Sequence, residues 1–78
     1  MYYIYILKCV DGVTYTGCTG DLKARIDRHR RGQVPATAKR LPVELVSYIA
    51  VHNKHKAFEL EKYFKSGSGR AFTKRHLL

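Results

Sequence analysis

Residues 1–18, MYYIYILKCVDGVTYTGC, decide the fold of this chain. The runs over residues 2–9 and 13–18 are rich in β-branched and aromatic side chains, which are typical of strands. Val10-Asp11-Gly12 lies between the two runs and has the composition of a tight turn. The sequence therefore predicts a β-hairpin at the start of the chain.

The length of the hairpin loop decides which side chains share a face of the sheet. A two-residue turn would place Tyr5 and Tyr15 on opposite faces. A three-residue loop with Gly12 in the left-handed conformation would instead oppose Tyr5 to Gly17 and Leu7 to Tyr15. Only the three-residue loop brings both tyrosines to one face.

Beyond the hairpin, hydrophobic periodicity and breaker residues divide the chain into further helices, strands and loops. The expected elements are a helix over 21–31 ended by Gly32, a loop over 33–42, a strand over 43–51, a helix over 54–65, a break at 66–69 and a short basic tail able to form one more helix. The order is β-β-α-β-α-α. We expect an α+β fold, with a small three-stranded sheet flanked by helices, in a single domain over residues 1–78.

The charge of the chain indicates a polyanionic partner. Fifteen lysines and arginines stand against six acidic residues, which leaves a formal net charge of +9 on 78 residues. So strong a positive field favours nucleic acid as the partner. An acidic membrane face, an acidic protein and a basic surface without a binding role remain as alternatives.

The cysteines, histidines and first residues of the chain exclude several classes of site. Cys9 and Cys18 are too few, and too far from a CxxC spacing, for a thiolate metal site or a disulfide framework. His52 and His55 lack the spacing that places two metal ligands on one helical face. The opening run is too short to span a membrane and has no signal-peptide pattern. We expect a cytoplasmic protein with no membrane association.

Both expected helices carry charged or polar side chains on their inward faces. Leu22 and Ile26 define the apolar stripe of the first helix, and the same stripe contains Arg25 and His29. The apolar stripe of the second helix contains Glu61 in the same way. Because a buried ionised side chain without a partner is costly, these three residues require an explanation.

Two interpretations of the inward charges stay open on the sequence alone. One is structural: an internal salt bridge between Arg25 and Glu61, or side chains that extend to the rim of the sheet. The other is functional: a cleft in which arginine binds a phosphate and glutamate holds a divalent cation. Tyrosine hydroxyls, Arg25 and Glu61 are the group types that phosphodiester hydrolysis needs.

Five matches in chain order connect the sequence with a known family. They are Tyr3-Ile4-Tyr5, Tyr15-Thr16-Gly17, Arg25, His29 and the segment AFELEKYFK over 57–65, which contains Glu61. With these residues the chain resembles the GIY-YIG nuclease family, in particular its small single-domain, excinuclease-C-like members. The resemblance spans nearly the whole chain, from Tyr2 to about Lys74.

The resemblance implies an endonuclease that cuts DNA, on a three-stranded antiparallel sheet with helices around it. It implies one Mg²⁺ or Mn²⁺ ion on Glu61 and a phosphate bound by Arg25. One of the hydroxyls of Tyr5 and Tyr15 would act on the attacking water, as a general base or by orienting it, and the other would fix the phosphate. His29 completes the catalytic set that the resemblance implies.

The sequence departs from the family pattern at three points. Tyr3 replaces the first glycine of the family name, and Cys18 replaces a lysine that often follows the second motif. Lys8, Lys39 and Arg40 are candidates to replace that missing cation. An asparagine about a dozen residues after the glutamate has no counterpart, because that region reads Ala71-Phe72-Thr73.

The basic residues outside the motifs are the candidate phosphate contacts. We expect nucleic-acid binding by Lys8, Arg25, Lys39, Arg40, Lys65 and Arg70, with Lys74 and Arg75 in the tail. Phosphate contacts do not read sequence and no element has the pattern of a recognition helix, so we expect low sequence specificity. Thr37 and Ser68 are left outside the site, because short polar residues in loops usually have a turn role.

The expected substrate is branched, flapped or damaged DNA in repair or recombination, with RNA open. Two alternatives to an autonomous nuclease also stay open. One is a non-catalytic nucleic-acid-binding module. The other is a nuclease subunit that is active only with a protein partner, which exposed apolar surface away from the cleft would favour.

Overall fold

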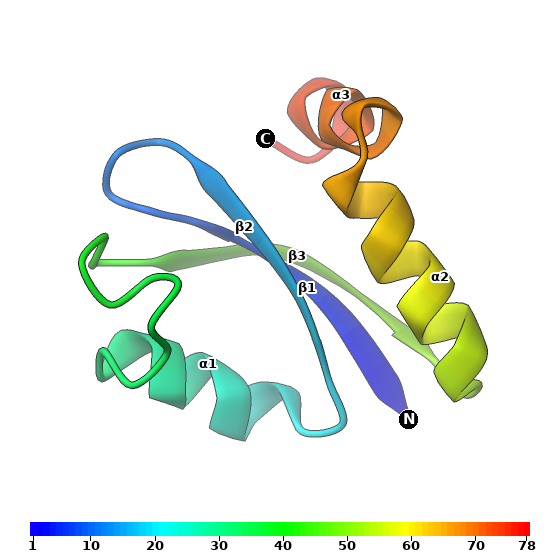
Figure 1. Cartoon of the computed structure of the whole chain (residues 1–78), viewed down its shortest axis with the longest axis horizontal. Helices are drawn as coiled ribbons and strands as arrows, with labels where there is room; N and C mark the ends of the chain where they lie inside the picture. Colours follow the sequence, from blue (N-terminus) through cyan, green and yellow to red (C-terminus); the bar gives the residue numbers. More distant parts are fainter.

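The computed structural model describes all 78 residues. It has a small sheet with helices on both sides (Figure 1). The elements in chain order are β1 (Tyr2–Lys8), β2 (Thr14–Thr19), α1 (Leu22–Arg30), β3 (Glu44–Val51), α2 (Lys54–Lys65) and α3 (Gly67–His76). This order is the α+β arrangement that the sequence predicts. None of the three helices combines the length and the hydrophobicity that a membrane span requires.

The hairpin adopts the three-residue loop, which places both tyrosines on one face. The backbone amide of Cys9 donates to the carbonyl of Val13 at 2.9 Å, and Gly12 has φ +81°. As a result Tyr5 lies opposite Gly17, and Leu7 opposite Tyr15. Strand β3 pairs antiparallel with the other side of β1, so the order across the sheet is β2-β1-β3.

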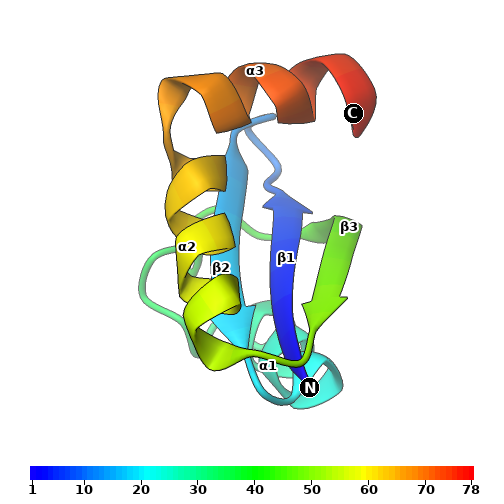
Figure 2. The same cartoon turned by 90° about the vertical axis from the view of Figure 1, so that its right-hand side faces the viewer.

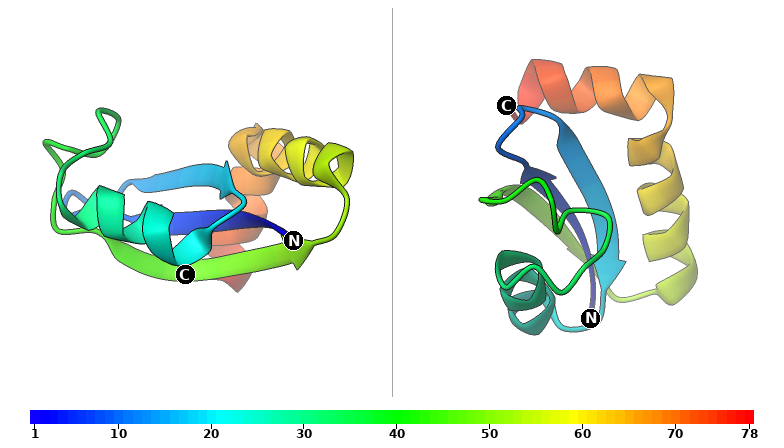
Figure 3. Two further views of the ribbon diagram at one scale, coloured as in Figure 1. Left: turned by 90° about the horizontal axis from the view of Figure 1, so that it is seen from below. Right: turned by 60° about the vertical axis from the view of Figure 1, so that its left-hand side comes forward.

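The alternation of side chains along β1 divides the core into two clusters. Tyr5 and Leu7 face α1 and pack with Ile26 of that helix. Ile4 and Ile6 face the other way and pack with side chains of α2, including Phe64. The two helices therefore cover opposite faces of the sheet, as the view from below shows (Figure 3, left). The polar side chains of α1 and those of α2 therefore lie on different faces of the sheet.

Short polar residues and one glycine fix the ends of the first two helices. The Asp21 carboxylate accepts from the amide of Ala24 at 3.1 Å, which caps the start of α1. Asn53 caps α2 through the amide of Lys56 in the same way. Gly32, with φ +74°, follows α1 and turns the chain into the loop, as the sequence predicts.

The expected break at 66–69 is much shorter in the structure. Only Ser66 separates α2 from α3, and its hydroxyl accepts from the amide of Gly69 to cap the new helix. Helix α3 runs across the end of α2 (Figure 2). A Cβ at position 69 would meet the backbone of Tyr63 and Phe64. The glycine read as a helix breaker is therefore a point of close approach between two helices.

We expect Gly69→Ala to destabilise the fold by about 1–3 kcal/mol, because backbone atoms of α2 cannot move away from the added methyl group. Gly67→Ala is the matched control, since a Cβ there meets no atom within 4 Å. In a domain of this size each kcal/mol shifts Tm by roughly 4–8 °C, so thermal unfolding by circular dichroism resolves the difference. Equal Tm values for the two variants would contradict the close-approach argument.

Candidate functional site

Arg25 lies half-buried on α1 and points toward the tyrosines. Its Nε–H donates to the Tyr5 hydroxyl at 3.3 Å. This hydrogen bond raises the pKa of Arg25 above its ordinary value, partial burial opposes the rise, and Tyr15 adds to it. The guanidinium therefore stays charged beside both tyrosine side chains. Its Nε is occupied by Tyr5, and its terminal nitrogens have no acidic partner.

Tyr5 is fully buried, and the position of its ring explains the glycine in the second motif. The ring lies directly over Gly17 on β2, where a Cβ would overlap the ring and its hydroxyl. Burial raises the pKa of Tyr5, and the nearby Tyr15 and Glu61 raise it further, while Arg25 lowers it. Tyr5 is therefore a protonated, solvent-excluded group at neutral pH.

His29 is also fully buried, and each of its ring nitrogens has one partner. Nε2 lies 2.9 Å from the Tyr5 hydroxyl, and Nδ1 lies 2.8 Å from Oγ1 of Thr37. Burial lowers the pKa of His29, and the charges of Arg25 and Arg28 lower it further. His29 is neutral at pH 7 and has no exposed surface that could meet a substrate.

The depressed pKa of His29 makes the stability of the fold depend on pH. The unfolded chain has the ordinary histidine pKa of 6.5, so it binds more protons than the folded chain just below that pH. Stability therefore falls as pH drops below about 6.5, by at most about 1.4 kcal/mol per pH unit. Urea unfolding between pH 7.5 and 5.0 measures this slope.

The non-titrating variant His29→Gln keeps a donor and an acceptor, and we expect a flatter pH profile from it. His52, an exposed histidine, provides the control variant His52→Gln, which should keep the wild-type slope. Wild-type slopes in both variants would show that His29 does not titrate differently in the folded chain.

Tyr15 is half-buried and lines an open groove together with basic side chains. The groove has a volume of about 310 Å³ and runs between β2, the loop before β3, and the ends of α2 and α3. Arg40, Lys65 and Arg70 contribute to its walls. The structure thus brings three of the predicted phosphate-binding residues to one groove, next to a tyrosine.

The remaining predicted phosphate contacts lie at different places. Lys8 and Lys39 are exposed and lie outside this groove. Arg25 is half-buried and lies beside Tyr5. Arg40 is held in position by an ion pair with Asp11 of the hairpin, at 3.0 Å between Nε and Oδ2. Of the three candidates to replace the missing lysine, only Arg40 lines the groove.

Glu61 forms its salt bridge with Lys65 and not with Arg25, the partner expected under the structural interpretation. Its carboxylate pairs with Lys65 one turn further along α2, at 3.1 Å, and the side chain is 23% exposed. No salt bridge joins it to Arg25. Glu61 lies near enough to raise the pKa of both Tyr5 and Cys18, secondarily to burial in each case. The internal Arg25–Glu61 bridge is therefore wrong, and the Glu61 side chain is partly buried and partly open to solvent.

The donors around Glu61 fit a hydrated ion and do not fit a closed protein cage. No group of three or more histidine, cysteine, aspartate or glutamate side chains is placed to hold a metal. Mg²⁺ usually keeps several waters and takes one or two carboxylates together with phosphate oxygens of a substrate. A single partly exposed carboxylate fits this pattern. Cys18, which replaces the lysine of the family pattern, packs on the same face of the sheet as α2. The cation beside Glu61 is Lys65 of α2 itself.

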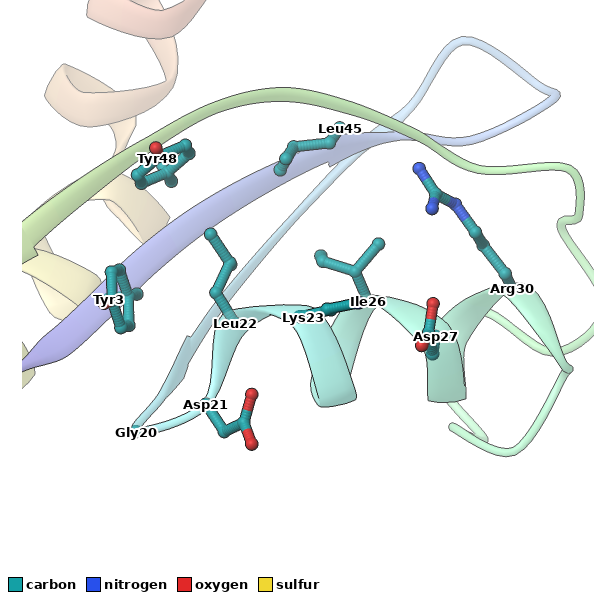
Figure 4. A pocket seen from close by; sticks show the side chains of 10 residues that line it. All are labelled: Tyr3, Gly20, Asp21, Leu22, Lys23, Ile26, Asp27, Arg30, Leu45 and Tyr48. Atoms are coloured by element: carbon teal, nitrogen blue, oxygen red, sulfur yellow. The ribbon is translucent and has the colours of Figure 1, made fainter.

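A larger hollow on the surface lies away from these residues. It measures about 570 Å³ between α1 and the β1–β3 side of the sheet, where Leu22 and Ile26 point toward Tyr3, Leu45 and Tyr48 (Figure 4). None of the five predicted catalytic residues lines this hollow. This hollow is therefore separate from the predicted catalytic residues.

Thr37, which has no expected role in the site, joins the cluster formed by Tyr5, Arg25 and His29. Thr37 is fully buried, and its hydroxyl contacts His29. The available signal was indirect: an inward-facing histidine needs a partner for each ring nitrogen, and Thr37 is the only hydroxyl side chain in the loop over 33–42.

Comparisons with known proteins agree on the family. The model of the GIY-YIG catalytic domain matches residues 1–75. A UPF0213 protein of Lacticaseibacillus paracasei is 46% identical over 65 residues, which cover 82% of this chain and 73% of the relative. A UPF0213 protein of Pediococcus acidilactici is 41% identical over 70 residues, covering 86% and 71% of the two chains.

A solved structure shows the same fold. The solution NMR structure of a UPF0213 protein from Bacillus halodurans is 38% identical and superposes with a TM-score of 0.61, over 96% of this chain and 82% of that one. A domain of this kind is typical of endonucleases that use divalent metal ions. The chain therefore belongs to the GIY-YIG catalytic domain family and is similar to small bacterial UPF0213 proteins.

Proposed function

We propose that this protein is a divalent-metal-dependent DNA endonuclease of the cytoplasm, with low sequence specificity, that cuts branched, flapped or damaged DNA in repair or recombination. The observation that carries the proposal is the position of Arg25. Its Nε–H is bound to Tyr5, while its terminal nitrogens lie free of any carboxylate. A charged, fixed guanidinium of this kind binds a phosphate well.

The residues around Arg25 suggest a division of roles between the two tyrosines. Tyr5 is buried and holds Arg25, so it acts as a positioning group. Tyr15 lines the open groove and is the tyrosine able to meet a water molecule. We assign Tyr15 to the orientation of the attacking water and Arg25 to the scissile phosphate. His29 acts through Tyr5, because it has no exposed surface.

Hydrolysis then needs one bond made and one broken at phosphorus. The water oxygen oriented by Tyr15 bonds to phosphorus, and the bond to the leaving sugar oxygen breaks. The proton released by the water returns through solvent to that oxygen. Arg25 stabilises the charge that develops on the phosphate oxygens. Glu61 would hold Mg²⁺ or Mn²⁺, which when bound supplies further positive charge against the phosphate and the leaving oxygen.

The groove supports recognition of the nucleic-acid backbone. Arg40, Lys65 and Arg70 line it from three different elements, so a chain of phosphates can follow it past Tyr15. Such contacts position a backbone and leave the bases unread. Low sequence specificity follows from this arrangement.

A cleavage panel tests the proposal. Purified protein is mixed with labelled plasmid, branched, flapped and single-stranded DNA and with RNA, each with Mg²⁺, with Mn²⁺ or with EDTA. We expect metal-dependent cuts that are most frequent in branched or flapped DNA and absent with EDTA. Binding without cleavage under every metal condition would contradict the proposal, and preferential cutting of RNA would contradict the assignment to DNA.

A second candidate function is a nuclease subunit that needs a protein partner. Phe58, Tyr63 and Phe72 expose between 41% and 51% of their surface on the outer sides of α2 and α3. Exposed aromatic residues of this kind favour a protein contact. Under this function the isolated chain binds DNA without cutting it. Phe58→Ser keeps the DNA binding of the isolated chain and abolishes activation of cleavage by the partner.

A further inference from the structure

We propose that Thr37 is a positioning residue of the site: its hydroxyl fixes the tautomer of His29, and through His29 and Tyr5 it keeps Arg25 in place for the phosphate. The inference rests on the proposed function, because it names a determinant of the same site. Thr37 has no surface exposure and belongs to none of the family motifs in the chain.

Hydrogen bonds link Arg25, Tyr5, His29 and Thr37 in series, and the donor and acceptor of each bond can be assigned by starting from Arg25. An arginine can only donate, so the Tyr5 hydroxyl accepts from Nε–H of Arg25. The hydrogen of the Tyr5 hydroxyl is then directed to Nε2 of His29, the other partner of that oxygen. Nε2 must therefore be unprotonated. In a neutral imidazole the hydrogen is then on Nδ1, which donates to Oγ1 of Thr37 at 2.8 Å.

The contact between His29 and Thr37 is buried, and its loss therefore has a large energetic cost. Tyr5, His29 and Thr37 are all excluded from solvent, so water cannot replace a missing partner. The structure leaves no buried polar side-chain atom without a partner. If Thr37 carried no hydroxyl, Nδ1–H of His29 would be left unpaired in the core, at the full desolvation cost of that group.

The neutral imidazole can exchange the unpaired donor for an unpaired acceptor at Nδ1 by moving its hydrogen to Nε2. In that tautomer His29 donates to the Tyr5 hydroxyl, and the hydrogen of Tyr5 must turn away from His29, toward Arg25. The Arg25–Tyr5 hydrogen bond is then lost, because two hydrogens would face each other. The guanidinium would lose its anchor although no residue that touches DNA has changed.

Thr37 also connects this buried series of hydrogen bonds to the groove. Its backbone amide donates to the carbonyl of Val34 at 3.1 Å, and its own carbonyl accepts from the amide of Arg40 at 2.9 Å. These bonds fix the turn that carries Arg40 into the groove. Both are backbone contacts, so a side-chain substitution at position 37 changes the histidine contact and leaves the turn in place.

Three variants separate positioning from stability. Thr37→Val removes the hydroxyl at nearly constant volume, and Thr37→Ser keeps it. Thr73→Val is the matched control, because Thr73 is also buried and its hydroxyl donates to the carbonyl of Gly69 in α3. Two NMR readouts are followed in each protein: the ¹⁵N shifts of His29, which report the tautomer, and the exchange of Nε–H of Arg25 with solvent. Steady-state cleavage of DNA gives kcat and KM.

We expect the Nδ1–H tautomer and a slowly exchanging Arg25 Nε–H in the wild type, in Thr37→Ser and in Thr73→Val. In Thr37→Val we expect the Nε2–H tautomer, faster exchange and a kcat about 10–100-fold lower at similar KM. Thr37→Ser should recover most of the loss. Recovery by serine is the result that a purely structural role of Thr37 does not produce.

Several results would overturn the inference. One is an Nε2–H tautomer in the wild type or in Thr37→Ser, which does not depend on how Thr37→Val folds. Another is Thr37→Val with unchanged tautomer, exchange and kcat. If the wild type does not cut DNA, the proposed function fails, while the tautomer and the Arg25 exchange still decide whether Thr37 positions the cluster.

Discussion

Arg25→Lys should lower the single-turnover rate of DNA cleavage by about 10²–10³-fold without unfolding the protein. Removal of one preorganised donor to a developing charge typically has an effect of this size. Lysine keeps the positive charge and loses the geometry. The guanidinium binds Tyr5 through Nε and leaves its terminal nitrogens for a phosphate. A single ammonium group cannot occupy both places.

Arg28→Lys provides the matched control for this experiment. Arg28 lies on the same helix, is exposed, and forms no salt bridge. We expect the control to cut at nearly the wild-type rate and both variants to unfold near the wild-type Tm, because Arg25 is only half-buried. Equal cleavage rates in Arg25→Lys and wild type would show that the phosphate is bound elsewhere.

The fold could be predicted from the sequence wherever local chemistry decides the structure. The hairpin register follows from Gly12 and from the condition that Tyr5 and Tyr15 share a face, and the structure has that register. The start of α3 could not be read in this way. Gly69 looks like a breaker in sequence, and only the packing of two helices shows why a side chain is excluded there.

The candidate site was predictable as a set of residues but not as a set of contacts. Helical periodicity predicts that Arg25, His29 and Glu61 face inward. Their partners lie far away in sequence or on another element, as with the contact of His29 to Tyr5 across 24 residues. The exception is Glu61 with Lys65, because their i, i+4 spacing is a local pattern that predicts an ion pair from the sequence.

Glu61→Gln should abolish metal-dependent cleavage, with a loss on the order of a thousandfold or more, while DNA binding is kept. Glu61 is the carboxylate whose charge reaches Tyr5, and no group of three or more histidine, cysteine, aspartate or glutamate side chains is placed to hold a metal instead. Glutamine has the same shape and no charge, so it cannot hold a hydrated divalent ion comparably. DNA binding should not weaken, because the substitution releases Lys65 from its ion pair at the edge of the groove.

Glu59→Gln removes the same charge from an exposed position of the same helix and serves as the matched control. Metal binding is measured separately from cleavage, as the rise in Tm on addition of Mn²⁺. A ligand that binds only the folded state raises stability, so the wild type and Glu59→Gln should show the rise and Glu61→Gln should not. A Tm rise in all three proteins, with cleavage lost only in Glu61→Gln, would mean that Glu61 acts on the substrate without holding the metal. Unchanged cleavage in Glu61→Gln would remove this carboxylate from the site altogether, and the nuclease mechanism would lose its place for the ion.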